Sequence, residues 1–260
     1  MSLDTYTSLD LPVPYRNIKI YPVTLKDYFS FNLYSQCFLV EKNNIPDVKI
    51  ISMSNLEYVY YASQGNTEQT PYIIWFDRLL SFCLKDEESF EDLSESIKRY
   101  KYDENGKPIF YIKGEKYTSK DFDELKRIIC EQNLVDLPDE NISKEVRDSL
   151  DEARKYKAKI SGSKSGSFED YIISLSVSTG WSFEYIYSMS IRKFVKSIRR
   201  LDNLIHYKIY LAASMSGMVE FKDKSFIKHW LTDIEDNDKY KDVSIGLDDM
   251  KGKISLESAK

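Results

Sequence analysis

The sequence contains few of the side chains that usually carry enzymatic chemistry. Two histidines and three cysteines stand among 260 residues. His206 and His229 lack an acidic or thiol partner at the spacing of metal ligands. Cys37, Cys83 and Cys130 lie in separate apolar runs, and no CxxC pair is present. We therefore expect buried, reduced thiols, no catalytic residue, no metal site and no cofactor, and we expect that the protein is not an enzyme.

Several other classes of protein also lack their usual signals here. The formal net charge of −5 gives no overall attraction to nucleic acid or to an anionic membrane. No apolar run approaches the ~20 residues that span a bilayer, and the first residues do not resemble a signal peptide. The segment 161–167, SGSKSGS, lacks the Gly-Lys-Ser/Thr ending of a phosphate-binding loop. The sequence thus predicts a cytoplasmic protein that binds neither membranes nor nucleotides.

Helical periodicity dominates what is present, and its longest example follows Ser190. Apolar residues recur there at helical spacing and form one stripe, which we expect to be buried along its whole length. The stripe consists of Ile191, Phe194, Val195, Ile198, Leu201, Ile205, Ile209 and Ala212. Ser190 suits the N-cap of this helix, and Gly217 suits the position just after its end. Another helix is expected over residues 48–62.

One β-hairpin interrupts the helical patterns in the first half of the chain. Residues 98–102 and 109–113 are strand-like, and the Asn105-Gly106 pair between them is a strong hairpin signal. The predicted fold is therefore mainly α with a small β-hairpin insert, in the α+β class. We expect an N-terminal α+β region over 1–158, a linker over 161–167, a C-terminal helical domain over 168–231 around the long helix, and a polar tail over 232–260.

Basic side chains gather at the start of the long helix. Five of them fall within nine residues: Arg192, Lys193, Lys196, Arg199 and Arg200. Two interpretations stay open. The helix–turn–short helix pattern over 168–200 is similar to a helix-turn-helix, which suggests a DNA-binding regulator. A basic face that contacts solvent or a protein partner explains the same pattern. It is favoured because an amphipathic helix needs a polar face and because the acidic segments 86–95 and 233–238 can neutralise these charges.

Tyrosine is abundant, with 20 residues beside 13 phenylalanines and 3 tryptophans. Tyrosine is enriched both in cores and at protein interfaces, because it buries area while keeping a polar tip. We expect most of these rings to lie in the core. On the tyrosine-rich segments 50–61 and 181–187, Tyr58, Tyr61 and Tyr185 are candidates for contact with a partner.

Several segments together resemble tail-assembly proteins of bacteriophages. They are NIKIYPVTLKDYF, KNNIPDVKIISMSNLEYVYY, YTSKDFDELKRIICEQN, STGWSFEYIYSMSIRKFVKSIRRL and KHWL, spread over roughly residues 16–231. The nearest likeness is to the baseplate hub assembly chaperones of contractile-tailed phages and their relatives in phages of Gram-positive hosts. This resemblance implies a non-enzymatic protein of the infected host's cytoplasm. Its partners would be tail, hub or tape-measure proteins, which it helps to fold or place; the further alternative is a structural baseplate subunit.

Overall fold

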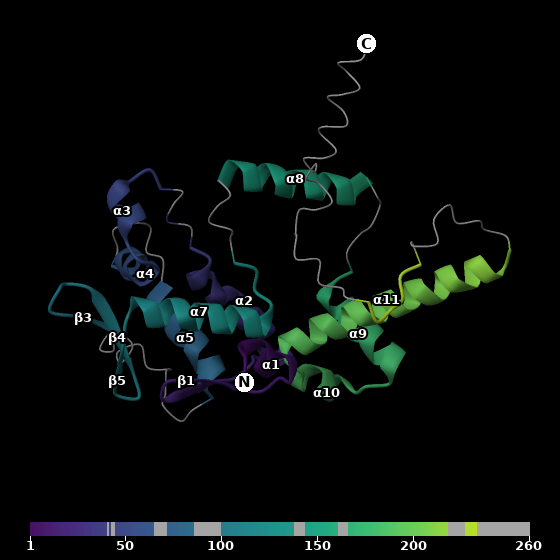
Figure 1. Ribbon diagram of the computed structural model, residues 1–260, viewed down its shortest axis with the longest axis horizontal. Helices are drawn as coiled ribbons and strands as arrows, with labels where there is room; N and C mark the ends of the chain where they lie inside the picture. The colour runs from purple at the N-terminus through teal and green to yellow at the C-terminus, as the bar shows by residue number, and fades with distance from the viewer. Residues whose placement is uncertain are drawn as a thin grey trace, which may run out of the picture. The chain divides into compact units, whose positions relative to one another are not determined.

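The computed structural model describes residues 1–40, 42, 45–64, 72–85, 100–137, 144–160, 166–217 and 227–232 (Figure 1). The chain divides into two compact units, which we call unit 1 (1–138 with 174–198) and unit 2 (139–173 with 199–260). Most of the expected linker and nearly all of the expected tail lie outside the described residues. The domain boundaries expected from the sequence, 1–158 and 168–231, therefore remain a prediction, separate from the division into units 1 and 2.

Unit 1 contains most of the described helices. They are α1 (Leu3–Ser8), α2 (Tyr28–Tyr34), α3 (Val48–Ser52), α4 (Asn55–Ser63), α5 (Tyr72–Leu84), α7 (Ser119–Asn133) and α10 (Phe183–Ser188), with 3-10 turns η1 (Leu25–Asp27) and η2 (Ser35–Phe38). Helices α9 (Phe168–Thr179) and α11 (Ile191–Met215) each have residues in both units, and α8 (Lys144–Ile160) belongs to unit 2. Helix α11 confirms the long helix that the apolar stripe predicts.

Two small antiparallel sheets accompany these helices. Strands β1 (Val13–Tyr15) and β2 (Ile18–Ile20) form one hairpin, and β3 (Tyr100–Tyr102), β4 (Pro108–Ile112) and β5 (Glu115–Tyr117) form a three-stranded sheet in that order. Tyr102 pairs with Pro108 across the turn that the sequence predicts, where Gly106 has a φ of 72°. The mainly α fold with a small β component is thus confirmed.

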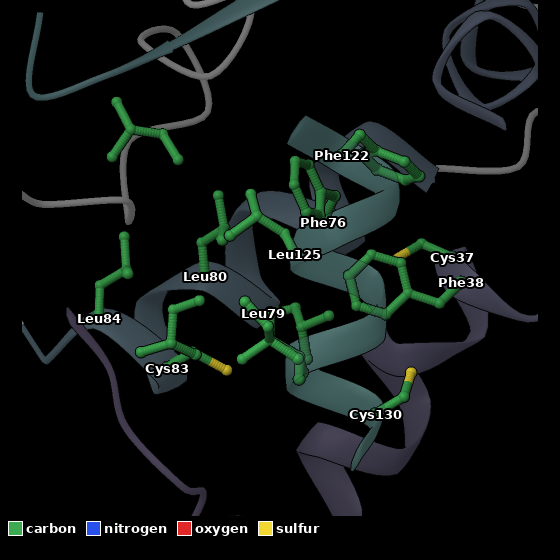
Figure 2. Packing of buried hydrophobic residues seen from close by; sticks show 14 of the residues in the cluster. Cys37, Phe38, Phe76, Leu79, Leu80, Cys83, Leu84, Phe122, Leu125 and Cys130 are labelled. Atoms are coloured by element: carbon green, nitrogen blue, oxygen red, sulfur yellow. The ribbon is translucent and has the colours of Figure 1, made fainter. Parts of the chain in front are cut away.

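The core of unit 1 lies between helices α5 and α7 and the turn η2. Phe38, Phe76 and Phe122 meet edge-on there, with ring centroids 4.9–5.8 Å apart (Figure 2). Such contacts add roughly 0.5–1.5 kcal/mol per pair beyond the buried area, because the positive edge of one ring faces the negative face of another. Phe110 brings β4 onto the same cluster at 5.5 Å from Phe76. The sheet and the helices therefore share one core.

The helix expected over 48–62 is two helices, α3 and α4. The break falls at Met53 and Ser54, because Ser54 caps a new helix: its Oγ accepts from the Glu57 amide at 3.2 Å, and the Glu57 carboxylate accepts from the Ser54 amide at 2.5 Å. This reciprocal pair is a capping box. The Ser-x-x-Glu spacing was visible in the sequence, and the continuous apolar pattern concealed it.

The stripe on α11 is buried only at its beginning, which corrects the expectation of burial along its whole length. Ile191 and Phe194 are buried, and Ile198 is half-buried. Farther on, Ile205 is 46% exposed and Ile209 is 56% exposed. Periodicity shows that a segment is helical and which face is apolar, but it does not show how much of that face a neighbour covers.

Candidate partner-binding surfaces

The first candidate surface is the run of basic residues at the start of α11, and its first member is not on the surface. Arg192 is 8% exposed, and its Nη1 donates to the carbonyl oxygen of Glu131 at 2.9 Å. Glu131 lies in the last turn of α7, where carbonyl groups have no partner within the helix. The guanidinium also brings a positive charge to the negative end of the α7 dipole. Arg192 therefore belongs to the internal structure of unit 1.

Backbone pairing holds this part of unit 1 together. Thr24 and Ser190 form an isolated antiparallel bridge, in which the Leu25 amide donates to the Met189 carbonyl at 2.8 Å and the Ile191 amide donates to the Val23 carbonyl at 3.0 Å. We call this bridge and the Arg192–Glu131 bond the clasp. It explains why residues 174–198 belong to unit 1 although they lie far along the chain.

The other basic residues also meet different surroundings. Lys193 Nζ lies 3.2 Å from the Asp10 carboxylate and stays 53% exposed, and Lys196 is half-buried. Arg199 is exposed. In unit 2, Arg200 Nη1 donates to the carbonyl oxygens of Trp230 at 2.8 Å and Thr232 at 2.7 Å, so it ties residues 227–232 to α11. The five basic residues that look alike in the sequence thus have different environments: some bond within the protein, and others are exposed to solvent.

The three candidate tyrosines differ in the same way. Tyr58 is 8% exposed and packs with Ile50 and Ala62 in a small cluster of its own, so its ring faces the interior. Tyr61 is half-buried beside that cluster. Tyr185 is 51% exposed on α10.

Tyr185 has aromatic neighbours that sequence reasoning did not select. Phe183 is 45% exposed and Tyr187 is 44% exposed on the same short helix, and the half-buried Trp181 meets the Tyr185 ring edge-on at 5.3 Å. We call Trp181, Phe183, Tyr185 and Tyr187 together the aromatic patch; Phe183 and Tyr187 share one side of α10, because they stand four residues apart, and Tyr185 lies on another side with Trp181. Aromatic residues at every second position of 181–187 were the available signal.

The helix that carries the aromatic patch is fixed at both ends. Ser182 caps its start, because its Oγ accepts from the Tyr185 amide at 3.2 Å, and the clasp follows its end. Ile186 is fully buried and anchors α10, which packs against η1. With one side held by Ile186, the other side chains of this six-residue helix point outward. Large aromatic side chains that stay exposed on a fixed helix are suited to contact with a protein partner.

The groups that could hold a metal or carry catalysis are dispersed in the described ranges. No cluster of three or more His, Cys, Asp or Glu side chains suited to a metal ion occurs among those residues. The expectation that His206 lacks an acidic partner was wrong, because Asp202 Oδ2 lies 3.4 Å from His206 Nδ1 one helical turn away. Both side chains are more than half exposed, and this pair alone makes no ligand set.

The cysteines lie in the core of unit 1, as expected (Figure 2). Burial raises the pKa of the Cys130 thiol to about 12 and raises those of Cys37 and Cys83 as well. Thiols with raised pKa values are poor nucleophiles and metal ligands near neutral pH, since the thiolate is the reactive form.

Comparison with known proteins matches a family model to the segment that carries the aromatic patch. The family model of the YomV second domain matches residues 160–235, which is less than a third of the chain. That family is phage-derived, so the match is consistent with a phage protein. Neither the curated proteins nor the solved structures gave a match.

No helix of the described parts is long and apolar enough to cross a membrane.

Proposed function

We propose that this chain is a non-enzymatic bacteriophage tail or baseplate hub assembly factor, which binds a tail, hub or tape-measure subunit and helps to fold or place it in the host cytoplasm. The observation that carries the proposal is the exposed aromatic patch inside the segment that matches a phage-derived family. Subunits of a tail expose apolar helices before they assemble. A partner that holds them needs anchored aromatic residues, which are frequent among the residues that dominate binding energy.

The basic residues of α11 support a protein partner better than DNA. A helix that reads DNA presents several cations to the phosphates and bases together. Here Arg192 is turned into unit 1 and Arg200 is bonded to two backbone carbonyls of unit 2. A DNA-binding regulator remains the alternative, and it predicts binding to duplex DNA that weakens steeply with salt and disappears in Arg199→Glu/Arg200→Glu.

The test is a pull-down with the tagged full-length chain from infected cells, with captured tail, hub and tape-measure subunits quantified by mass spectrometry. The double variant Phe183→Ser/Tyr187→Ser should retain about a tenth or less of the captured subunit, because losing two hot-spot rings costs at least ~1.4 kcal/mol of binding. Phe29→Ser is the matched control, since Phe29 is 67% exposed on α2, outside the matched segment.

Two results would contradict the proposal. One is that no tail, hub or tape-measure subunit is captured while those subunits are expressed. The other is that the Phe29 variant loses as much capture as the patch variant. Mass spectrometry of mature particles then separates an assembly factor from a structural baseplate subunit, because only the structural subunit remains in every particle.

A further inference from the structure

A small open cavity lies between helix α4 and the hairpin of β3 and β4, away from the aromatic patch. Its volume is about 180 Å³. By liquid volume this corresponds to about six water molecules, and it lies below the roughly 300–1,000 Å³ typical of cofactor and drug-sized ligand sites. The cavity therefore suits a single side chain. Its lining consists of Met53, Glu57, Tyr60, Tyr61, Gln64, Tyr102, Gly106 and Pro108.

Three tyrosine rings define the walls of this cavity. Glu57, Tyr60 and Tyr61 share one face of α4, because they stand three and four residues apart. Tyr102 comes from β3, and its ring meets that of Tyr60 at right angles with centroids 5.0 Å apart. Gln64 Nε2 donates to the Tyr102 hydroxyl at 3.3 Å. The rings from the helix and from the hairpin thus hold each other in position.

The hairpin turn contributes Gly106 to the lining of the cavity. Gly106 has a φ of 72°, which favours glycine at this point of the turn, and a Cβ placed there would meet nothing within 4 Å. The turn is fixed by Asp103, whose Oδ1 accepts from the amides of Asn105 at 2.9 Å and Lys107 at 2.8 Å.

Glu57 gives the cavity its charge. It is the charged member of the lining, and one of its oxygens is occupied by the Ser54 amide in the capping box. Lys42 donates to the carbonyl oxygen of Met53 at the edge of the cavity, but neither Lys42 nor Lys107 is a lining residue. An anionic ligand such as a phosphate would meet the Glu57 carboxylate, which repels it.

We propose that this cavity is a binding site for an arginine side chain of a partner protein. The flat guanidinium stacks on aromatic faces and donates in its plane to a carboxylate, so the tyrosine rings and Glu57 satisfy both of its requirements. The proposal goes beyond the assembly role and stands on different residues. Loss of binding here would leave the aromatic patch intact, and loss of the patch would leave this cavity intact.

Binding is tested on the full-length chain with glycine-selective ¹⁵N labelling, which gives signals from only nine residues. Gly106 lines the cavity, whereas Gly114 lies in the next turn and serves as the internal control. The probe is N-acetylarginine methylamide, titrated at constant ionic strength. We expect a saturable shift of the Gly106 amide signal in the millimolar range without one at Gly114. The uncharged isostere N-acetylcitrulline methylamide should bind about fivefold more weakly or worse, because it loses both the cation–π contact and the charge-assisted hydrogen bond to Glu57.

Two single-charge variants make the test specific. Glu57→Gln removes the charge from the cavity and keeps the capping box, which accepts glutamine at this position, so it should weaken binding by about fivefold or more without unfolding α4. Glu104→Gln removes the same charge from the exposed hairpin turn outside the lining and should leave affinity unchanged. The proposal is overturned if Gly106 does not respond, if citrulline binds as tightly as arginine, or if the two variants weaken binding equally.

Discussion

Arg192 and Lys193 are adjacent basic residues whose replacement should have very different effects on stability. We consider the same substitution at each site, Arg192→Met and Lys193→Met, because methionine keeps an unbranched apolar stem and removes only the charged end. Arg192 is buried and bonded to the Glu131 carbonyl at 2.9 Å. Lys193 is 53% exposed and reaches Asp10 across 3.2 Å at the surface.

The magnitudes follow from these surroundings. A hydrogen bond from a charged donor contributes about 1.5–3 kcal/mol, and removing this one also leaves a carbonyl at the end of α7 without its partner. The favourable contact with the helix dipole adds about 0.3–1 kcal/mol to the stability of the parent. In the opposite direction, the variant no longer bears the desolvation cost of a buried guanidinium, which reduces the net loss. We expect Arg192→Met to lower the free energy of unfolding by about 2 kcal/mol. A surface ion pair is worth ~0–1 kcal/mol, so Lys193→Met should cost at most about 0.5 kcal/mol.

Thermal and urea unfolding, followed by near-ultraviolet circular dichroism, measure both effects. For a chain of this size, 2 kcal/mol corresponds to a drop in Tm of roughly 4–8 °C, and Lys193→Met should stay within about 2 °C of the parent. The reasoning is refuted if the two variants have the same stability. It is also refuted if Arg192→Met is as stable as the parent and instead loses the captured tail subunit, because Arg192 would then be a surface residue that contacts the partner.

Three further predictions concern titratable groups of unit 1. Because burial raises the pKa of each cysteine thiol, a thiol reagent at mildly alkaline pH should label none of the three in the folded protein and all three in urea; rapid labelling of the folded chain would contradict this. Burial alone would raise the pKa of Asp121, but hydrogen bonds from Thr118 and Tyr15 and the charge of Arg16 lower it overall. The stabilisation from the Asp121 carboxylate is therefore present above the ordinary pKa of an aspartate and is lost as pH falls through the lowered value. In urea titrations at several pH values, the free energy of unfolding of Asp121→Asn should fall less steeply toward acid than that of the parent. An equally steep fall in both proteins would count against this network. Burial raises the pKa of Tyr117 to about 12, so the stabilisation from the neutral phenol is complete below the ordinary tyrosine pKa and is lost as pH rises toward 12. In Tyr117→Phe the free energy of unfolding should therefore fall less steeply at alkaline pH. An equally steep fall in the parent and the variant would be inconsistent with this reasoning.

Local patterns in the sequence predicted the elements that local physics determines. The hairpin at Asn105-Gly106 forms because glycine supplies the positive φ that the turn needs, and helix α11 forms over the apolar stripe that begins at Ile191 and Phe194. The cap of α10 at Ser182 is a local feature of the same kind, because the Ser182 side chain accepts from the amide of Tyr185. Each of these features depends on residues within a few positions of one another, so one segment contains the whole signal.

Which basic residues of α11 are buried and which are exposed could not be predicted from local patterns. Arg192 and Arg199 are both arginines on the polar side of one helical pattern, seven residues apart, yet one is buried and the other exposed. The difference arises because the end of α7, 61 positions earlier in the chain, supplies the Glu131 carbonyl. Charge spacing along a helix contains no information about such a distant acceptor. The cavity of Glu57 and Tyr102 was missed for the same reason, since its walls come from two separate segments.

The clasp also bears on how the aromatic patch would bind. Exposed side chains on a mobile segment lose conformational freedom when a partner fixes them, at about 0.5–1.5 kcal/mol for each immobilised flexible side chain. Helix α10 is already held by the buried Ile186, by the cap at Ser182 and by backbone pairing at Ser190. Its aromatic rings have only two side-chain torsions each, so most of the ordering is completed when unit 1 folds. A substitution that loosens the clasp should therefore weaken partner binding through the patch, although no residue of the clasp need touch the partner.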